Sequence, residues 1–188
     1  MSIGAAFSAV VLAGGVAARL DGADKASIEL GGRTLLTWAL DAVIDAAEVV
    51  VVGDAVPTHR PVTFTREDPR HGGPVAALLT GRDALLDPRE SVAVLACDMP
   101  FLTAQSFHRL RDAARGHDGA VLVGPDGRRQ LAMVLDVARL DAVRPSIEEQ
   151  HNLALHRLLA PLDLAEVRAE GREHRDVDTW SDVRDLTS

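Results

Sequence analysis

Residues 7–25, FSAVVLAGGVAARLDGADK, form the stretch of sequence that decides the fold. The stretch begins with a short apolar run that ends at Gly14 and Gly15. A partly β-branched run closed by glycine is typical of a strand that is buried on both faces. We do not expect a secretory signal, because no positive residue precedes the run and two glycines interrupt it. The stretch therefore predicts a core strand over residues 7–13 and a glycine-rich loop that leads to Lys25.

Apolar runs and helical periods alternate along the rest of the chain. Further strands are predicted over residues 49–52, 62–65, 92–97, 120–123, 131–136 and 164–167. Helices are predicted over residues 34–46, 74–86, 103–115, 138–143, 153–159 and 179–186. Apolar strands separated by amphipathic helices are typical of a parallel sheet with helices on its faces. We therefore expect an α/β protein with a mostly parallel central sheet.

The composition limits the class of protein. A length of 188 residues predicts one domain over residues 1–188. A formal net charge of -8 argues against a sequence-independent nucleic-acid binder, which needs a basic surface. No apolar run reaches the ~18 residues of a membrane helix, so we expect no membrane contact. The one cysteine, Cys97, cannot form an internal disulfide, and we expect a cytoplasmic protein.

Lysine is almost absent from the chain. Of the 20 Lys and Arg residues, Lys25 alone is a lysine, which leaves 19 arginines. Replacement of lysine by arginine under a composition bias explains the 19 arginines, but not the lysine that stays. Lys25 ends the loop that follows the first predicted strand, and that position suggests a function.

Glycine, arginine and lysine in this loop suit an anion. Ligands of open α/β sheets bind beyond the carboxyl ends of the strands. A glycine pair there lets backbone N–H groups approach a phosphate, and Arg19 and Lys25 add positive charge. The spacing matches neither the Walker A pattern nor the Rossmann fingerprint. A plain strand-to-helix turn with solvated charges is the alternative interpretation.

Three aspartates further along the chain could take part in the same site. Asp98 ends the strand predicted over residues 92–97, where it could hold Mg²⁺ beside a phosphate, or cap the turn before Pro100. Asp178 could be a second metal ligand, or Asp178 or Thr179 could cap the last helix. Asp68 lies in the loop before a second glycine pair. Each signal is weak by itself.

Their order along the chain is specific, and it resembles the nucleotidyltransferases of the molybdenum cofactor guanylyltransferase family. The motifs that carry the resemblance are Leu12-Ala13-Gly14-Gly15, Arg19, Gly22, Asp24-Lys25, Gly72-Gly73-Pro74, Cys97-Asp98-Met99-Pro100-Phe101 and Asp176-Val177-Asp178-Thr179. The resemblance covers essentially the whole chain. It implies a Rossmann-like three-layer nucleotidyltransferase fold, with a nucleotide-binding half of about residues 1–102 and an acceptor-binding half of about residues 103–188.

The resemblance also implies a role for each matching residue. Lys25 matches the phosphate-binding lysine, Arg19 a second phosphate contact, and Asp98 the metal ligand, with Asp178 as the second candidate ligand. Asp68 matches the acidic residue that reads the guanine edge. Backbone contacts to the nucleotide carry over to Leu12, Ala13, Gly14 and Gly15.

The implied reaction moves GMP from GTP to molybdopterin or its molybdenum-loaded form and releases pyrophosphate, with Mg²⁺ or Mn²⁺ as cofactor. Gly14 favours GTP, because the cytidylyl relatives tend to have alanine there. Candidate contacts to the pterin phosphate acceptor are Arg128, Arg129 and Arg157. Transient contact with molybdoenzyme maturation proteins is also implied.

Two other functions stay open. The chain could be a cytidylyl- or sugar-phosphate-type nucleotidyltransferase that uses the same metal chemistry. It could also be a nucleotide-binding module without turnover, because its closing motif departs from the family pattern Asn-x-Asn-Thr-Pro. Here the motif has two aspartates and ends at Trp180 in place of proline.

Overall fold

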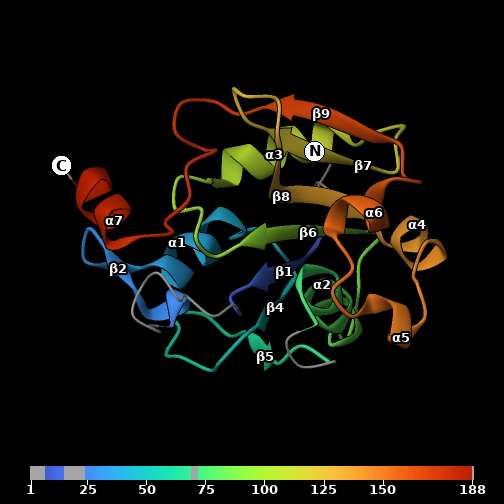
Figure 1. Ribbon diagram of the computed structural model, residues 1–188, viewed down its shortest axis with the longest axis horizontal. Coiled ribbons are helices and arrows are strands. Elements are labelled where there is room, and N and C mark those ends of the chain that lie inside the picture. Colours follow the sequence, from blue (N-terminus) through green and yellow to red (C-terminus); the bar gives the residue numbers. More distant parts are fainter. Residues whose placement is uncertain (1–6, 15–23, 69–71, 188) are drawn as a thin grey trace.

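The computed structural model describes residues 7–14, 24–68 and 72–187, and a seven-stranded sheet runs through its centre (Figure 1). The strand order is β5-β4-β1-β6-β8-β7-β9. The strands are β1 (Ser8–Leu12), β4 (Glu48–Val52), β5 (Thr63–Thr65), β6 (Ser91–Ala96), β7 (Gly119–Val123), β8 (Arg129–Asp136) and β9 (Leu164–Arg168). All neighbours are parallel except β8, which is antiparallel to β6 and β7. The predicted α/β class with a mostly parallel sheet is confirmed.

The orientation of β8 has a local cause. A tight turn joins β7 to β8, in which the Gly127 N–H donates to the Gly124 carbonyl at 3.0 Å. Gly127 has φ of 80°, a left-handed conformation that glycine adopts without steric cost. This hairpin returns the chain directly beside β7, so no crossover helix separates the two strands.

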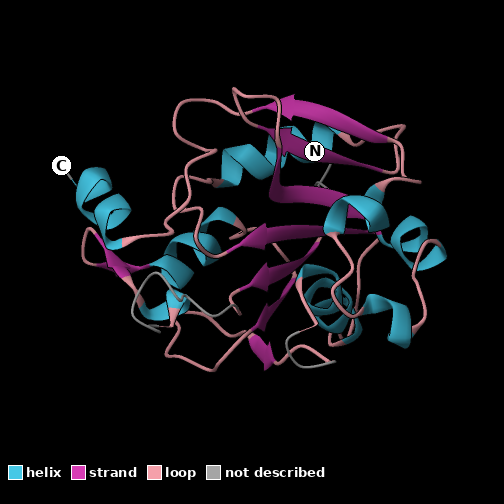
Figure 2. Ribbon diagram, in the orientation of Figure 1, coloured by secondary structure: helices cyan, strands magenta, loops and turns pink. Residues whose placement is uncertain are grey.

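Helices cover both faces of the sheet, which makes the predicted three layers (Figure 2). The helices are α1 (Leu35–Ala42), α2 (Pro74–Asp83), α3 (Ala104–Ala113), α4 (Val137–Ala142), α5 (Ile147–Gln150), α6 (Leu155–Leu159) and α7 (Trp180–Thr187). Buried residues of α1 and α3 share one apolar cluster, and those of α2, α4 and α6 share another. Successive residues of β1 alternate between the clusters, with Val11 in the first and Val10 in the second, as the two-residue period of a strand requires.

Close packing fixes α2 on the sheet. A Cβ added to Gly81 would lie 2.4 Å from a methyl of Val10 and 2.8 Å from a methyl of Val52. Only a glycine lets α2 approach β1 and β4 this closely. The contact places Gly73, the N-cap of α2, at the carboxyl edge of the sheet, where the predicted site residues lie.

The structure differs from the sequence prediction in short elements. A 3₁₀ helix (Lys25–Ser27), the hairpin of β2 (Glu29–Leu30) and β3 (Arg33–Thr34), and α5 were not predicted. Two-residue strands and a four-residue helix are too short to show a period. The predicted helices over 34–46, 74–86 and 103–115 are real but end two to four residues early, at Ala42, Asp83 and Ala113. Among the described helices, none has the length and apolar character needed to cross a bilayer.

Candidate functional site

The loop after β1 is fastened to the neighbouring strand. The N–H groups of Ala13 and Gly14 both donate to the Val52 carbonyl, at 2.9 and 2.8 Å. A Cβ on Gly53 would lie 3.1 Å from Ala13, so glycine permits this close approach. Leu12 and Ala13 are buried, whereas Gly14 is exposed. The first described residues of the predicted nucleotide loop are therefore held at the carboxyl edge, between β1 and β4.

Lys25 begins the 3₁₀ helix that follows. Asp24 is the N-cap of this helix, and its carboxylate accepts from the Ala26 N–H at 3.1 Å. The Lys25 ammonium donates to Oδ2 of Asp98 at 2.7 Å and to Oδ1 of Asp178 at 2.8 Å. Asp98 and Asp178 are 73 and 153 residues away from Lys25 in sequence, so the fold brings together three of the predicted site residues.

Partial burial strengthens this cluster. The side chains of Lys25 and Asp98 are 17% and 19% exposed, and that of Asp178 is 45% exposed. Burial by itself lowers the pKa of Lys25, but the hydrogen bonds to Asp178 and Asp98 outweigh it and hold the pKa above its ordinary value. Lys25 is therefore charged at neutral pH and neutralises part of the negative charge of the two carboxylates.

The helix-cap alternative for Asp178 is not what the structure shows. Thr179 caps α7 instead: its hydroxyl accepts from the Asp182 N–H at 3.2 Å, and Asp182 Oδ2 accepts from the Thr179 N–H at 2.7 Å. This reciprocal pair is a capping box. The Asp178 carboxylate is thus directed to Lys25.

A buried valine anchors the segment that carries Asp178. The Val177 N–H donates to the Asp98 carbonyl at 2.9 Å, and its fully buried side chain packs in a small apolar cluster with Ile28, Leu30 and Leu35. Asp176 directly precedes Val177 in the chain and lies two residues before Asp178. Burial, followed by the negative charge of Asp178, raises the pKa of Asp176 above its ordinary value.

The carboxylates fit a divalent cation that is completed by phosphate. Asp98 and Asp178 already converge on one positive charge, the Lys25 ammonium. No group of three or more His, Cys, Asp or Glu side chains in the described parts of the chain could hold a metal without other ligands. Mg²⁺ is commonly held by one or two carboxylates, with substrate phosphates and water as its other ligands.

Asp68 is a predicted site residue that lies apart from the Lys25 cluster. Asp68 follows β5, its side chain is exposed, and its backbone N–H donates to the Thr80 hydroxyl of α2 at 3.0 Å. It is placed at the carboxyl edge but is not part of the Lys25 cluster. Gly15 and Arg19 lie outside the described residues.

The sequence predictions did not include the buried Glu173, which binds Ser106 and Arg109 of α3. No local pattern marks it, because its partners are 67 and 64 residues away.

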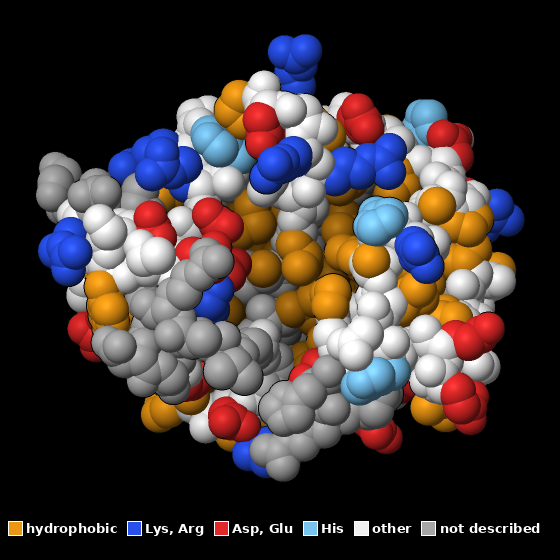
Figure 3. Space-filling model, in the orientation of Figure 1, with side chains coloured by type: hydrophobic (Ala, Val, Ile, Leu, Met, Phe, Trp, Pro, Cys, Tyr) orange, Lys and Arg blue, Asp and Glu red, His pale blue; other side chains and the backbone are white. Residues whose placement is uncertain are grey.

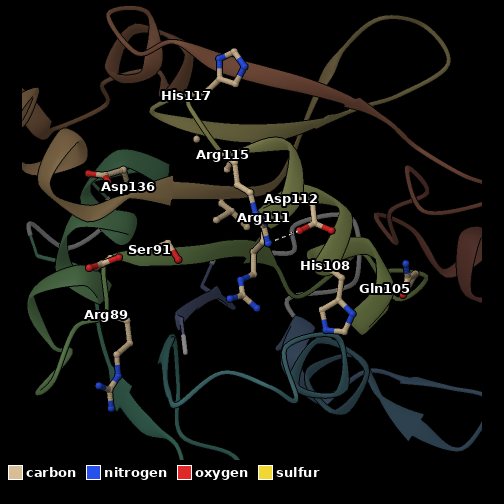
Figure 4. Close-up of a pocket in the computed structure, with 13 residues that line it drawn as sticks. Arg89, Ser91, Gln105, His108, Arg111, Asp112, Arg115, His117 and Asp136 are labelled. Atoms are coloured by element: carbon tan, nitrogen blue, oxygen red, sulfur yellow. Dashed lines mark ion pairs between the residues drawn. The ribbon is translucent and has the colours of Figure 1, made fainter. Parts of the chain in front are cut away.

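A cavity of about 1020 Å³ lies at the opposite edge of the sheet (Figure 4). It is lined by residues at the start of β6 and β7, such as Ser91 and Gly119, and contains none of the predicted site residues. His108 and His117, drawn in Figure 4, contact Asp45 and Asp163, each at 2.8 Å. Volume alone does not make this cavity the candidate site.

An apolar hollow is visible on the face shown in Figure 3, over the middle of the sheet and beside α6. Partly buried apolar residues on this side of the sheet include Leu131 of β8 and Leu155 of α6. Arginine and histidine side chains border the hollow. A flat, partly apolar ligand with an anionic group would find both kinds of contact there.

Comparisons with known proteins agree with the resemblance seen in the motifs. The family model described as "MobA-like NTP transferase domain" matches residues 9–170. A molybdenum cofactor guanylyltransferase of Mesorhizobium japonicum is 32% identical over 158 residues, which cover 76% of this chain and 73% of that protein. Several similar Shewanella relatives of the same name are matched over about two thirds of their length.

Solved structures share the fold. A 2-C-methyl-D-erythritol 4-phosphate cytidylyltransferase from Thermus thermophilus superposes with a TM-score of 0.75 at 22% identity, covering 97% of each chain. A molybdopterin-guanine dinucleotide biosynthesis protein A from Archaeoglobus fulgidus has a TM-score of 0.73 at 17% identity, covering 96% of this chain and 97% of that one. Because both identities are low, these structures establish the nucleotidyltransferase fold and nothing finer.

Proposed function

Because the chain belongs to the MobA-like NTP transferase family, we propose that it transfers GMP from GTP to molybdopterin, or to its molybdenum-loaded form, and releases pyrophosphate. The observation that supports this most strongly is the double ion pair of Lys25 with Asp98 and Asp178. It combines a phosphate-binding cation and two metal-binding carboxylates at the sheet edge where α/β proteins bind ligands.

Alignment and charge neutralisation are the main catalytic tasks. An acceptor phosphate oxygen attacks the α-phosphorus of GTP, the bond to the β-phosphate oxygen breaks, and pyrophosphate leaves. Both reactants are anions, so positive charge around the phosphates lowers the barrier. Lys25 and Arg19 stabilise the charge that builds on pyrophosphate. The acceptor phosphate is already ionised at neutral pH, so the chain needs no general base.

Asp98 and Asp178 would hold Mg²⁺, or Mn²⁺ in its place. When bound, such an ion would supply positive charge that neutralises the phosphates. In the free protein the Lys25 ammonium takes this neutralising role for the same two carboxylates. We propose that Lys25 leaves the carboxylates for the phosphates when the metal and the nucleotide bind.

Gly14 and Asp68 are the residues we assign to base choice. Gly14 is exposed at the end of β1, and a Cβ there would be 3.5 Å from the Val52 carbonyl, an ordinary contact. The protein itself therefore tolerates alanine, and the missing methyl leaves space for a purine. Asp68, exposed at the same edge, has a carboxylate that can accept from the N1–H and amino group of guanine.

The acceptor is assigned to the half of about residues 103–188, where the apolar hollow suits a pterin ring. Of the candidate anion contacts, Arg129 pairs with Glu166 at 3.1 Å, and Arg128 pairs more weakly with Asp126 at 3.5 Å. Arg157 lies exposed in α6, the helix beside the hollow. The buried lone Cys97 agrees with a reaction in a reducing cytoplasm.

The test is to incubate the purified protein with Mg²⁺, molybdopterin and each of the four NTPs, and to identify the nucleotide on the product by mass spectrometry. We expect pyrophosphate release and a guanylylated pterin with GTP. A sugar phosphate in place of molybdopterin serves as the competing acceptor. Product with CTP or a sugar phosphate alone would replace the proposal by the related transferase activity, and GTP binding without any pyrophosphate would indicate a silent module.

A further inference from the structure

The position of Asp178 depends on a segment without regular structure. Residues 169–179, all of them described, connect β9 to α7 through turns. The Asp178 side chain is 45% exposed, and its carboxylate accepts from the Lys25 ammonium at 2.8 Å. The preceding residue, Val177, is anchored by its buried side chain and by its N–H bond to the Asp98 carbonyl. The points at which the rest of the segment is fastened to the protein add to these contacts in setting the distance from Asp178 to Asp98.

Glu173, five residues before Asp178, is a second fastening point of this segment. Its side chain is only 9% exposed, although it carries a carboxylate. It accepts hydrogen bonds from the Ser106 hydroxyl, from Nη2 of Arg109 at 2.7 Å and from the Glu170 N–H at 2.7 Å. Arg109 also pairs with Glu170 at 2.6 Å. The segment is thus held on α3 by a buried carboxylate with three donors.

The same contacts reach the loop that carries Asp98. The Ser106 hydroxyl accepts from the Thr103 N–H at 3.0 Å in the capping box that starts α3, just after the Asp98 loop. The guanidinium of Arg172 lies 4.1 Å from the ring centroid of Phe101, in the same loop. The Glu173 network therefore ties together the two loops that supply the two carboxylates.

We propose that Glu173 is a positioning residue for the metal site: by its bonds to Ser106 and Arg109 it holds Asp178 at the distance from Asp98 at which both carboxylates bind one cation. The inference rests on the proposed nucleotidyl transfer, whose metal these carboxylates would hold. Glu173 lies five residues before Asp178 and does not contact the reacting groups.

The chemistry explains why the charge of Glu173 matters. A neutral amide at this position keeps the volume but weakens the bond to Arg109, a half-buried arginine whose buried Nε already has no partner within the described part of the structure. Removing one partner from a buried charged network costs more stability than removing one partner from an exposed ion pair. The segment would then be held on α3 less firmly, and the Asp178 carboxylate would be positioned by the Val177 anchor and Lys25.

The test compares Glu173→Gln with Asp118→Asn. Asp118 is a matched control, because it accepts from Arg139 at 2.7 Å and from the Asp163 N–H at 2.9 Å, but it lies at the start of β7, on the other edge of the sheet. Mn²⁺ affinity is measured by electron paramagnetic resonance of the free ion in the presence of GTP. Metal-dependent pyrophosphate release gives the Mg²⁺ concentration for half-maximal rate and the KM for GTP at saturating Mg²⁺.

We expect Glu173→Gln to weaken Mn²⁺ binding about tenfold and to raise the Mg²⁺ requirement by a similar factor, the usual range for outer residues of a metal site. The KM for GTP at saturating Mg²⁺ should change less than twofold, and Asp118→Asn should change neither metal value. A lower melting temperature with wild-type Mn²⁺ affinity would overturn the proposal and leave Glu173 a stabilising residue only.

A second variant and a separate reading of the Mn²⁺ data cover the cases in which Glu173→Gln does not fold or the wild type is inactive. If Glu173→Gln does not fold, Arg109→Lys replaces the fork of two N–H donors by a single ammonium, and the same rise in the Mg²⁺ requirement is expected; wild-type values there would overturn the proposal. If the wild type binds Mn²⁺ but transfers no nucleotide, the proposed function fails, while the Mn²⁺ comparison of the variants still decides the role of Glu173.

Discussion

The two edges of the central sheet both carry charged residues, but they use them differently. At the carboxyl edge, Lys25 bonds to two carboxylates that come from remote parts of the chain. At the amino edge, a cavity of about 1020 Å³ is lined by several basic residues, yet their ion pairs are mostly local or exposed. Arg115 pairs with Asp112 one turn away, and Arg89 pairs with Asp87, two residues away.

This difference between the two edges separates a candidate functional site from an ordinary charged surface. Partly buried charges that converge from separate loops at the ligand-binding edge of an α/β sheet are candidates for a functional site. Local pairs at an exposed surface contribute little energy and need no ligand to explain them. We therefore assign function to the carboxyl edge, although the cavity of about 1020 Å³ lies at the other edge.

The largest expected effect is on turnover. Lys25→Met should lower the rate of pyrophosphate release by about 100-fold or more, because it removes a cation from the developing charge of the leaving group. Lys25→Arg should not restore the wild-type rate, since a planar guanidinium does not replace a compact ammonium. The matched change at the amino edge, Arg139→Met, should leave the rate within about twofold. Near-wild-type release by Lys25→Met would remove Lys25 from the mechanism.

The next effect is on metal binding in the absence of nucleotide. Lys25→Met should bind Mn²⁺ more tightly than the wild type, by about tenfold, because the ammonium no longer competes for Asp98 and Asp178. Asp98→Asn should weaken binding. Free Mn²⁺ is measured by electron paramagnetic resonance, with circular dichroism as the check on folding. Equal or weaker Mn²⁺ binding by Lys25→Met would contradict the exchange of Lys25 for the metal.

A smaller effect concerns base choice. Gly14→Ala should shift the ratio of kcat/KM for GTP over CTP towards CTP by about tenfold, since one methyl group in a pocket is worth ~1–3 kcal/mol. The melting temperature should hardly change, because the added Cβ makes only an ordinary contact with Val52. An unchanged ratio would show that Gly14 does not select the base.

The smallest effect is confined to the amino edge. The Arg139 guanidinium, together with the Asp163 N–H, holds the pKa of Asp118 below its ordinary value of 3.8. A carboxylate with a lowered pKa stabilises the folded state above pH 3.8, and this contribution disappears as the pH falls through the lowered pKa. Asp118→Asn should therefore melt slightly below the wild type at pH 7, and this difference should shrink as the pH falls below 3.8, without a change in turnover. Equal melting temperatures at pH 7 would show that the pair adds no stability.

Much of the carboxyl edge could be predicted from the sequence, because its signals are local. A buried strand that ends in glycine, or in Asp98, is visible in a few neighbouring residues. The importance of Lys25 was predicted from the scarcity of lysine in the chain and from the motif around it. The hydrogen bonds that join Lys25 to Asp98 and Asp178 are long-range, so their geometry could be obtained only from the fold.

Other features had no local signal. Glu173 looks like any charged residue of a polar segment, since the donors that bury it belong to α3. The reversed direction of β8 depends on a short turn at Gly124 and Gly127, and the helical and strand periods are the same for either direction. Thr179 and Asp178 were equal candidates for the cap of α7, and the position of Asp182 three residues after Thr179 decides between them.

The central claim is that the Lys25, Asp98 and Asp178 cluster at the carboxyl edge transfers the nucleotide. The most direct test follows a label on the α-phosphate of GTP into molybdopterin, in the presence of Mg²⁺, for the wild type, Asp98→Asn and Asp118→Asn. We predict labelled pterin with the wild type and with Asp118→Asn, and a loss of about 100-fold or more with Asp98→Asn. Equal labelling by Asp98→Asn and the wild type would contradict the account.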